Sequence, residues 1–128
     1  MRVIVDPNAD ASGFGHADAG RYTLRIVKIT EEKKNFPYLK LEAEFSDPNV
    51  KATDGKSKVG HVFENMTLKT ENNAQFRLRQ FSDALGLTWG DFDTDDVIGM
   101  EFEAALNVDL FNPENPTNKI AKFFPKGK

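Results

Sequence analysis

Apolar and polar residues alternate along five segments of the chain, with the two-residue period of a strand that is buried on one face. The clearest segment is 38–45, in which every second residue from Leu39 to Phe45 is apolar, those between are Lys or Glu, and Tyr38 precedes them. The other four strands are predicted over 20–30, 58–68, 102–108 and 119–124. In the first of these four, Val27 and Ile29 break the alternation, which predicts a β-bulge or a strong bend.

One stretch follows the helical period instead. Its apolar residues recur at spacings of three and four: Ala74, Leu78, Phe81 and Leu85. This spacing predicts a helix over 73–85, which Gly86 ends. Asn72 and Gln75 stand three residues apart before the apolar run, as the two partners of a capping box do.

Residues 87–99 predict a short helical turn, capped by Asp93 or Thr94. The order of elements is then three strands, one main helix between the third and fourth strands, and two further strands. That is the order of the OB-fold, a five-stranded and partly open Greek-key barrel. We therefore expect a mostly β, OB-fold-like domain over 20–128, preceded by a flexible arm over 1–19. Other small five-stranded barrels share this order, so they remain alternatives to the OB-fold.

Composition narrows the class of protein. The length of 128 residues suits one domain, and the absence of cysteine excludes disulfides, thiolate metal sites and cysteine nucleophiles. No apolar run approaches the roughly 18 residues of a membrane span, and 1–20 lack the pattern of a signal peptide. We expect a cytoplasmic protein with no membrane contact. Its net charge of −3 argues against a surface that is basic throughout, so any nucleic-acid surface must be local.

Positive residues gather in two segments, 21–40 and 111–128. They are Arg21, Arg25, Lys28, Lys33, Lys34, Lys40, Lys119, Lys122, Lys126 and Lys128. If the two segments form neighbouring strands, their side chains make one basic face on an acidic protein. The alternative is that these charges only solvate the outer faces of strands and protect the sheet edges.

Six segments together resemble a known family. They are 20–22, 39–45, 62–68, 79–86, 97–99 and 118–125. In them the chain is similar to small bacteriophage proteins of OB type, which occur among replication and recombination proteins and are treated as single-stranded DNA binders. The resemblance implies binding of single-stranded DNA during phage replication or recombination in the bacterial host cell, with a recombinase or another replication protein as a further partner.

Single-strand binding needs cations that follow the phosphates and aromatic faces on which bases stack. In an OB-fold the surface is made by strands 2 and 3 and by the loops that join strands 1 to 2 and 4 to 5. If Val62 and Met66 face the core, His61 and Phe63 face outward. The candidate contacts are Arg25, Lys28, Lys33, Lys34, Phe36, Tyr38, Lys40, Lys58, Phe63, Phe111, Lys119 and Lys122. Lys69 is expected to lie outside this groove.

The remaining aromatic residues are expected to be structural. Phe45, Phe76, Phe81 and Phe102 fall on core positions, and Trp89 is expected to close one end of the barrel. Phe123 and Phe124 are adjacent in a strand, so one should be buried and the other available.

Two functions stay open. The first is sequence-tolerant binding of single-stranded DNA. The second is a protein-interaction module of the same fold that binds a recombinase or a host protein. For Phe63 alone, cover by a second copy of the chain or by the N-terminal arm is the alternative to base stacking. An enzyme is not expected, because no catalytic motif occurs, and neither is a cofactor or metal, since the run from Asp91 to Asp96 lacks the Gly and Glu of a calcium loop.

Overall fold

The computed structural model describes residues 1–5, 15–33, 35–55, 57–90, 92–111, 113 and 116–127. Its elements, in chain order, are β1 (Gly20–Glu32), β2 (Tyr38–Phe45), β3 (Val62–Thr67), α1 (Phe76–Leu85), the 3-10 helix η1 (Thr94–Asp96), β4 (Glu101–Asp109) and β5 (Thr117–Phe124). Over these described residues the protein is mostly β, with one α-helix. No helix in the described ranges is both long enough and apolar enough to span a membrane.

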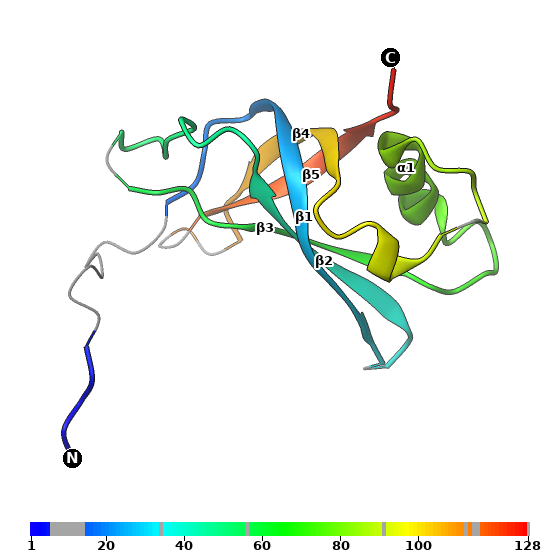
Figure 1. Ribbon diagram of the computed structural model, residues 1–128, viewed down its shortest axis with the longest axis horizontal. Helices are drawn as coiled ribbons and strands as arrows, with labels where there is room; N and C mark the ends of the chain where they lie inside the picture. The colour runs from blue at the N-terminus through cyan, green and yellow to red at the C-terminus, as the bar shows by residue number, and fades with distance from the viewer. Residues whose placement is uncertain are drawn as a thin grey trace.

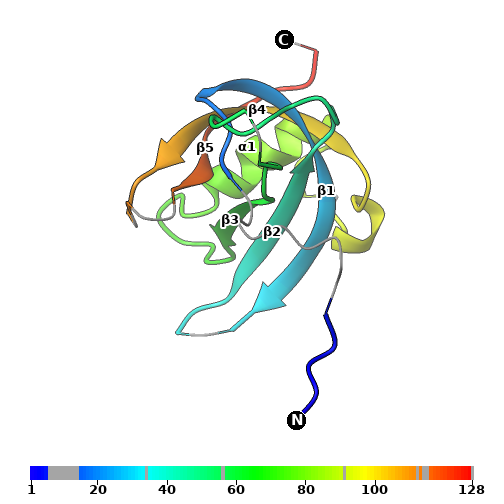
Figure 2. The ribbon, with the colours of Figure 1, turned by 90° about the vertical axis from the view of Figure 1, so that its left-hand side faces the viewer.

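The five strands form one antiparallel sheet in the order β3-β2-β1-β4-β5. β1 lies at its centre and pairs with β4 through its first half and with β2 along most of its length. The register of the β1–β2 pair shifts between Ile26 and Lys28, which confirms the predicted irregularity. The sheet is strongly curved, with α1 at one end of it (Figures 1 and 2). Its edge strands β3 and β5 are not paired to each other, so the sheet is not closed.

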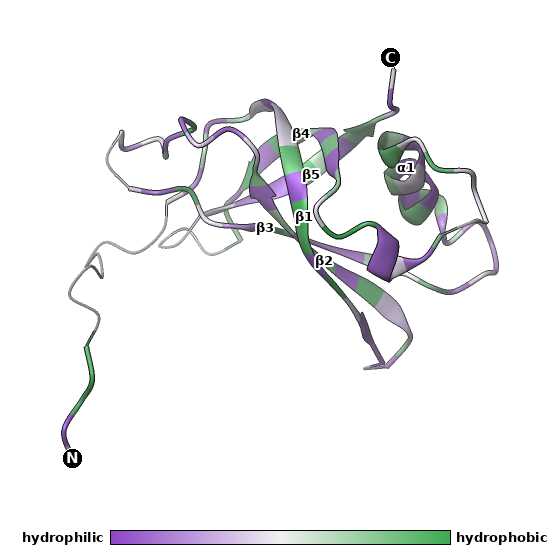
Figure 3. Cartoon of the chain, in the orientation of Figure 1, coloured by the Kyte–Doolittle hydropathy of each residue, from purple (hydrophilic) through white to green (hydrophobic). Residues whose placement is uncertain are grey.

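The alternating pattern places the core on one face of the sheet. Figure 3 shows the alternation as apolar and polar bands along the strands. Leu41 and Ala43 of β2 are fully buried, as predicted. The centre of the core is Phe81 of α1, whose ring lies 5.4 Å from that of Phe102 and 5.6 Å from that of Phe123, measured between centroids.

The start of α1 differs from the prediction. The helix begins at Phe76, because Asn72 and Asn73 both have φ of 56°, a left-handed conformation that an α-helix cannot contain. The predicted capping box is wrong, since the Gln75 side chain donates from Nε2 to the Leu68 carbonyl oxygen at 3.0 Å and caps nothing. Gly86, at φ 75°, ends the helix as predicted.

Phe76 was predicted to lie in the core, and this prediction is wrong. Phe76 is 52% exposed. Phe76 precedes the buried Leu78 by two residues, and two residues turn an α-helix by about 200°. The Phe76 ring therefore lies on the helix face opposite to the core.

Arg77 of α1 spans the gap between the two edge strands. It donates from Nε and Nη2 to Glu64 Oε1 of β3, at 3.0 and 2.8 Å, and from Nη2 to the Ile120 carbonyl oxygen of β5 at 3.0 Å. The guanidinium carbon also lies 4.8 Å from the Phe123 ring centroid. A helix side chain thus links β3 to β5 where no main-chain ladder does. The sequence analysis missed this role.

The N-terminal segment joins the fold before Gly20. Gly15 donates its N–H to the Lys58 carbonyl oxygen at 2.8 Å, and Ala17 is fully buried. The Asn118 side chain holds Ala17 from both sides, accepting from its N–H and donating to its carbonyl oxygen. Residues 15–17 therefore pack with the domain, whereas 6–14 of the predicted arm lie outside the described residues.

Candidate nucleic-acid interface

Phe63 lies on the outer face of β3 and is 48% exposed, whereas Val62 and Met66 are fully buried. The predicted strand parity is therefore confirmed. Lys40 of β2 lies on the same face, and its Nζ is 5.4 Å from the Phe63 ring centroid. An accessible aromatic face and an ammonium group are thus side by side, which is the pairing that a stacked base and its phosphate need.

A second aromatic group lies at the β1–β2 turn. Phe36 is 41% exposed, and its ring centroid is 5.8 Å from that of Tyr38. Lys69 places its Nζ 4.9 Å from the Phe36 centroid, because the Leu68 N–H bonds to the Pro37 carbonyl oxygen and ties the end of β3 to this turn. The prediction that Lys69 lies outside the groove is therefore wrong.

Two further candidates belong to this turn. Lys33 is exposed, and its Nζ lies 3.7 Å from Glu31 Oε1, so its charge is partly offset. Lys34 lies outside the described residues.

The outer face of β1, β2 and β3 carries charges of both signs. Arg25 Nη1 contacts Glu44 Oε1 at 3.1 Å, and His61 Nδ1 lies 2.7 Å from Glu42 Oε2. Lys28 and Lys40 line a shallow hollow of about 110 Å³ together with Glu32 and Glu42. Neither lysine forms an ion pair with a residue that the structure describes, so these two ammonium groups remain available to a ligand.

The other candidates are spread over the molecule. Phe111, after β4, is 95% exposed. Lys119 and Lys122 are exposed on β5, where Lys122 Nζ lies 5.3 Å from the Phe124 ring centroid. Lys58 lies at the opposite end of the β2–β3 pair from Tyr38, so the structure does not bring it to the β1–β2 turn.

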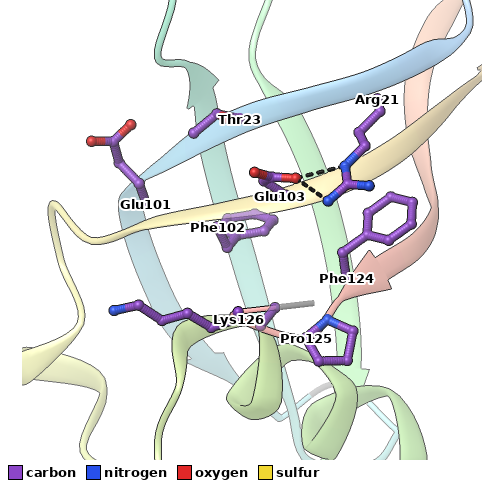
Figure 4. Close-up of a pocket in the computed structure, with 10 residues that line it drawn as sticks. Arg21, Thr23, Glu101, Phe102, Glu103, Phe124, Pro125 and Lys126 are labelled. Carbon is purple, nitrogen blue, oxygen red and sulfur yellow. Dashed lines mark hydrogen bonds and ion pairs between the residues drawn. The ribbon is translucent and has the colours of Figure 1, made fainter.

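Phe124 and Arg21 belong to a separate hollow of about 310 Å³ near the end of β5 (Figure 4). Phe123 is buried and Phe124 is half-buried, as the prediction for this pair requires. Arg21 donates from Nε to Glu103 Oε2 at 2.6 Å, and its guanidinium carbon lies 4.0 Å from the Phe124 centroid. Arg21 is paired with Glu103, and Glu101 and Lys126 line the same hollow, so this hollow carries charges of both signs.

A third hollow, of about 400 Å³, lies at the start of α1. Trp89 lines it and is 36% exposed, with the guanidinium carbon of Arg79 at 5.8 Å from its ring. The expectation that Trp89 closes the barrel end is therefore wrong, since its ring lies beside solvent and not in the core.

The acidic run near η1 acts as a helix cap. Asp93 accepts a hydrogen bond from the Asp95 N–H at 3.0 Å, which confirms the capping prediction. Asp91 lies outside the described residues, and among the residues described no group of three His, Asp or Glu side chains could hold a metal ion.

Comparisons of the sequence with protein-family models and with curated proteins find no match. The choice of function therefore depends on the geometry of these surfaces.

Proposed function

We propose that the protein binds single-stranded DNA with little sequence preference. Bases stack on Phe63 and on Phe36, and the ammonium groups of Lys40, Lys69 and Lys28 contact the phosphates. The observation that carries this proposal is the Phe63 ring, 48% exposed on a sheet face with Lys40 Nζ at 5.4 Å from its centroid. Stacking tolerates any sequence because every base has an aromatic face.

The strand order supports an OB-type barrel as the scaffold of this surface. β3 and β5 are the two edges of the sheet, and the link from Arg77 to both of them is consistent with a barrel that remains open there. In such a fold the outer face of β2 and β3 and the β1–β2 turn are the usual binding surface. Phe63, Lys40 and Phe36 belong to these two regions.

The biological setting follows from the resemblance described above and is part of the proposal. The protein would coat or present displaced strands during phage replication or recombination in the cytoplasm of the host cell, beside a recombinase or another replication protein. Its contribution would be binding and not catalysis.

A protein-interaction module remains the second candidate, and one observation favours it. Acidic side chains share the outer face with the lysines, and two of them are in close pairs, Glu44 with Arg25 and Glu42 with His61. These carboxylates reduce the attraction for phosphates, while exposed Phe63 and Phe111 would suit an apolar partner.

Fluorescence anisotropy separates the two candidates. Labelled oligo-dT, duplex DNA and single-stranded RNA are each titrated at two salt concentrations. We expect oligo-dT to bind more tightly than duplex DNA, with log K falling against log salt by about 0.7 for each phosphate contacted. Absence of binding to every oligonucleotide would refute the proposal and leave the protein-interaction module.

Charge reversal tests where the strand lies. Lys40→Glu and Lys69→Glu should each weaken oligo-dT binding, because each places a carboxylate beside an aromatic ring of the surface. The matched control is Lys51→Glu, an equal charge change at an exposed residue of the β2–β3 connection, away from the β1–β2 turn. Equal losses for all three variants would mean that only net charge matters.

A further inference from the structure

The hollow at the start of α1 contains two aromatic rings that the core does not use. It is lined by Thr70, Asn73, Gln75, Phe76, Arg79, Gln80 and Trp89. Phe76 is 52% exposed and Trp89 is 36% exposed, whereas Phe81 of the same helix is fully buried. Large rings at the rim of a polar hollow offer stacking faces to a ligand.

The other side chains of the hollow limit what that ligand is. Arg79 forms no ion pair within the part of the chain that the structure describes, and its guanidinium lies over the Trp89 ring at 5.8 Å. Asn73 and Gln80 add exposed amides, which both donate and accept hydrogen bonds. A flat aromatic ligand with hydrogen-bonding edges and an attached anion uses all three features, and an unpaired nucleobase with its phosphate is such a ligand.

The loop that forms one wall is held in place by the protein itself. Gln75 Nε2 bonds to the Leu68 carbonyl oxygen at 3.0 Å, and the Ala74 N–H bonds to the Glu71 carbonyl oxygen at 3.0 Å. Asn72 and Asn73 both adopt φ of 56°, which is uncommon for residues other than glycine. The wall therefore has its shape before any ligand binds.

The same loop connects the hollow to the interface at the β1–β2 turn. Thr70, which lines the hollow, follows Lys69, whose Nζ lies 4.9 Å from the Phe36 centroid. We infer that the hollow is a base-binding subsite, in which one nucleotide of the strand that passes Phe36 stacks on Trp89 and contacts Phe76 while Arg79 contacts its phosphate. This inference rests on the proposed binding of single-stranded DNA and extends the path of that strand to α1.

Trp89 is the single tryptophan of the chain, so its emission reports directly on this subsite. Oligo-dT is titrated into the full chain while Trp89 emission is recorded, and labelled oligo-dT gives the anisotropy curve in parallel. We expect emission to fall and to saturate at the same concentration as the anisotropy. Thymidine monophosphate serves as the second probe. If it quenched Trp89 emission at the same concentrations as oligo-dT, the inference that the subsite takes a nucleotide of a bound strand would be overturned.

Variants complete the test. Arg79→Gln and Phe76→Leu should each weaken oligo-dT binding by about fivefold or more, with melting temperatures close to that of the unmodified protein because both residues are exposed. Lys51→Gln is the control for loss of one charge and should leave affinity unchanged. The subsite would be overturned if anisotropy showed oligo-dT binding while Trp89 emission stayed constant, or if Arg79→Gln bound oligo-dT as tightly as Lys51→Gln. The proposed function would stand in either case. If the unmodified protein bound no oligonucleotide, both the subsite and the proposed function would be overturned.

Discussion

Replacing Phe63 by alanine separates the binding role of this ring from its structural role. The ring is about half exposed, so truncation removes only about half of the roughly 1.5–3 kcal/mol that full burial of such a side chain contributes. We expect a loss of about 1 kcal/mol in the free energy of unfolding, or about 3–5 °C in melting temperature for a domain of this size. The weak contact with Lys40, at 5.4 Å, adds little to this loss.

The expected effect on DNA binding is larger. Loss of one stacking ring costs about 1–3 kcal/mol of affinity for each base that it holds, which weakens oligo-dT binding by about 5- to 150-fold. The assay is a pair of measurements on Phe63→Ala: the melting temperature and the anisotropy-derived Kd for oligo-dT.

Two variants calibrate that pair. Ile98→Ala removes an apolar side chain of equal exposure, 48%, that follows η1 and lies outside the sheet, so it should leave the Kd unchanged. Phe81→Ala removes a fully buried ring that contacts three other aromatic rings and should cost about 3–5 kcal/mol of stability. If Phe63→Ala lost as much stability as Phe81→Ala while its Kd matched that of Ile98→Ala, the stacking role would be refuted.

Two further variants test how the sheet is held together. Arg77→Met should lower the free energy of unfolding by about 2 kcal/mol, because it leaves the carboxylate of Glu64, whose side chain is only 17% exposed, without its partner. In urea denaturation the double variant Glu64→Gln/Arg77→Met should be more stable than Arg77→Met alone. The reverse order would contradict this explanation. Gly15→Ala should cost about 1–3 kcal/mol in the same assay, since its Cβ would stand 2.6 Å from that of Ala52. An unchanged denaturation midpoint for Gly15→Ala would show that residues 15–17 are not part of the cooperative fold.

Local periodicity was sufficient for the buried faces of the strands, although the strand predicted over 58–68 begins only at Val62. In 38–45 the alternation gave the correct buried face, and the same reasoning correctly divided Phe123 from Phe124. These predictions succeed because a strand with one buried face has a strict two-residue period and few alternatives.

The errors come from contacts that the local pattern does not contain. Asn72 and Gln75 have the spacing of a capping box, but a hydrogen bond from Gln75 to Leu68 takes the side chain away from the helix. Lys69 reaches Phe36 only because β3 ends beside the β1–β2 turn. Arg77 bonds to an oxygen 43 residues further along the chain, a separation at which no sequence spacing is informative.

The central position of β1 has a consequence for how the chain folds. Gly20 pairs with Leu106 and Arg25 with Glu101, so half of the ladder along β1 joins residues about 80 positions apart. Bringing such distant segments together costs entropy before any contact repays it, which slows folding into the range of milliseconds to seconds. During synthesis the β1–β2 and β2–β3 pairs can form early, but the first half of β1 has no partner strand until β4 leaves the ribosome. Until then Leu24 and its apolar neighbours on β1 lack part of their packing, which is the stage at which a newly made chain is most exposed to aggregation.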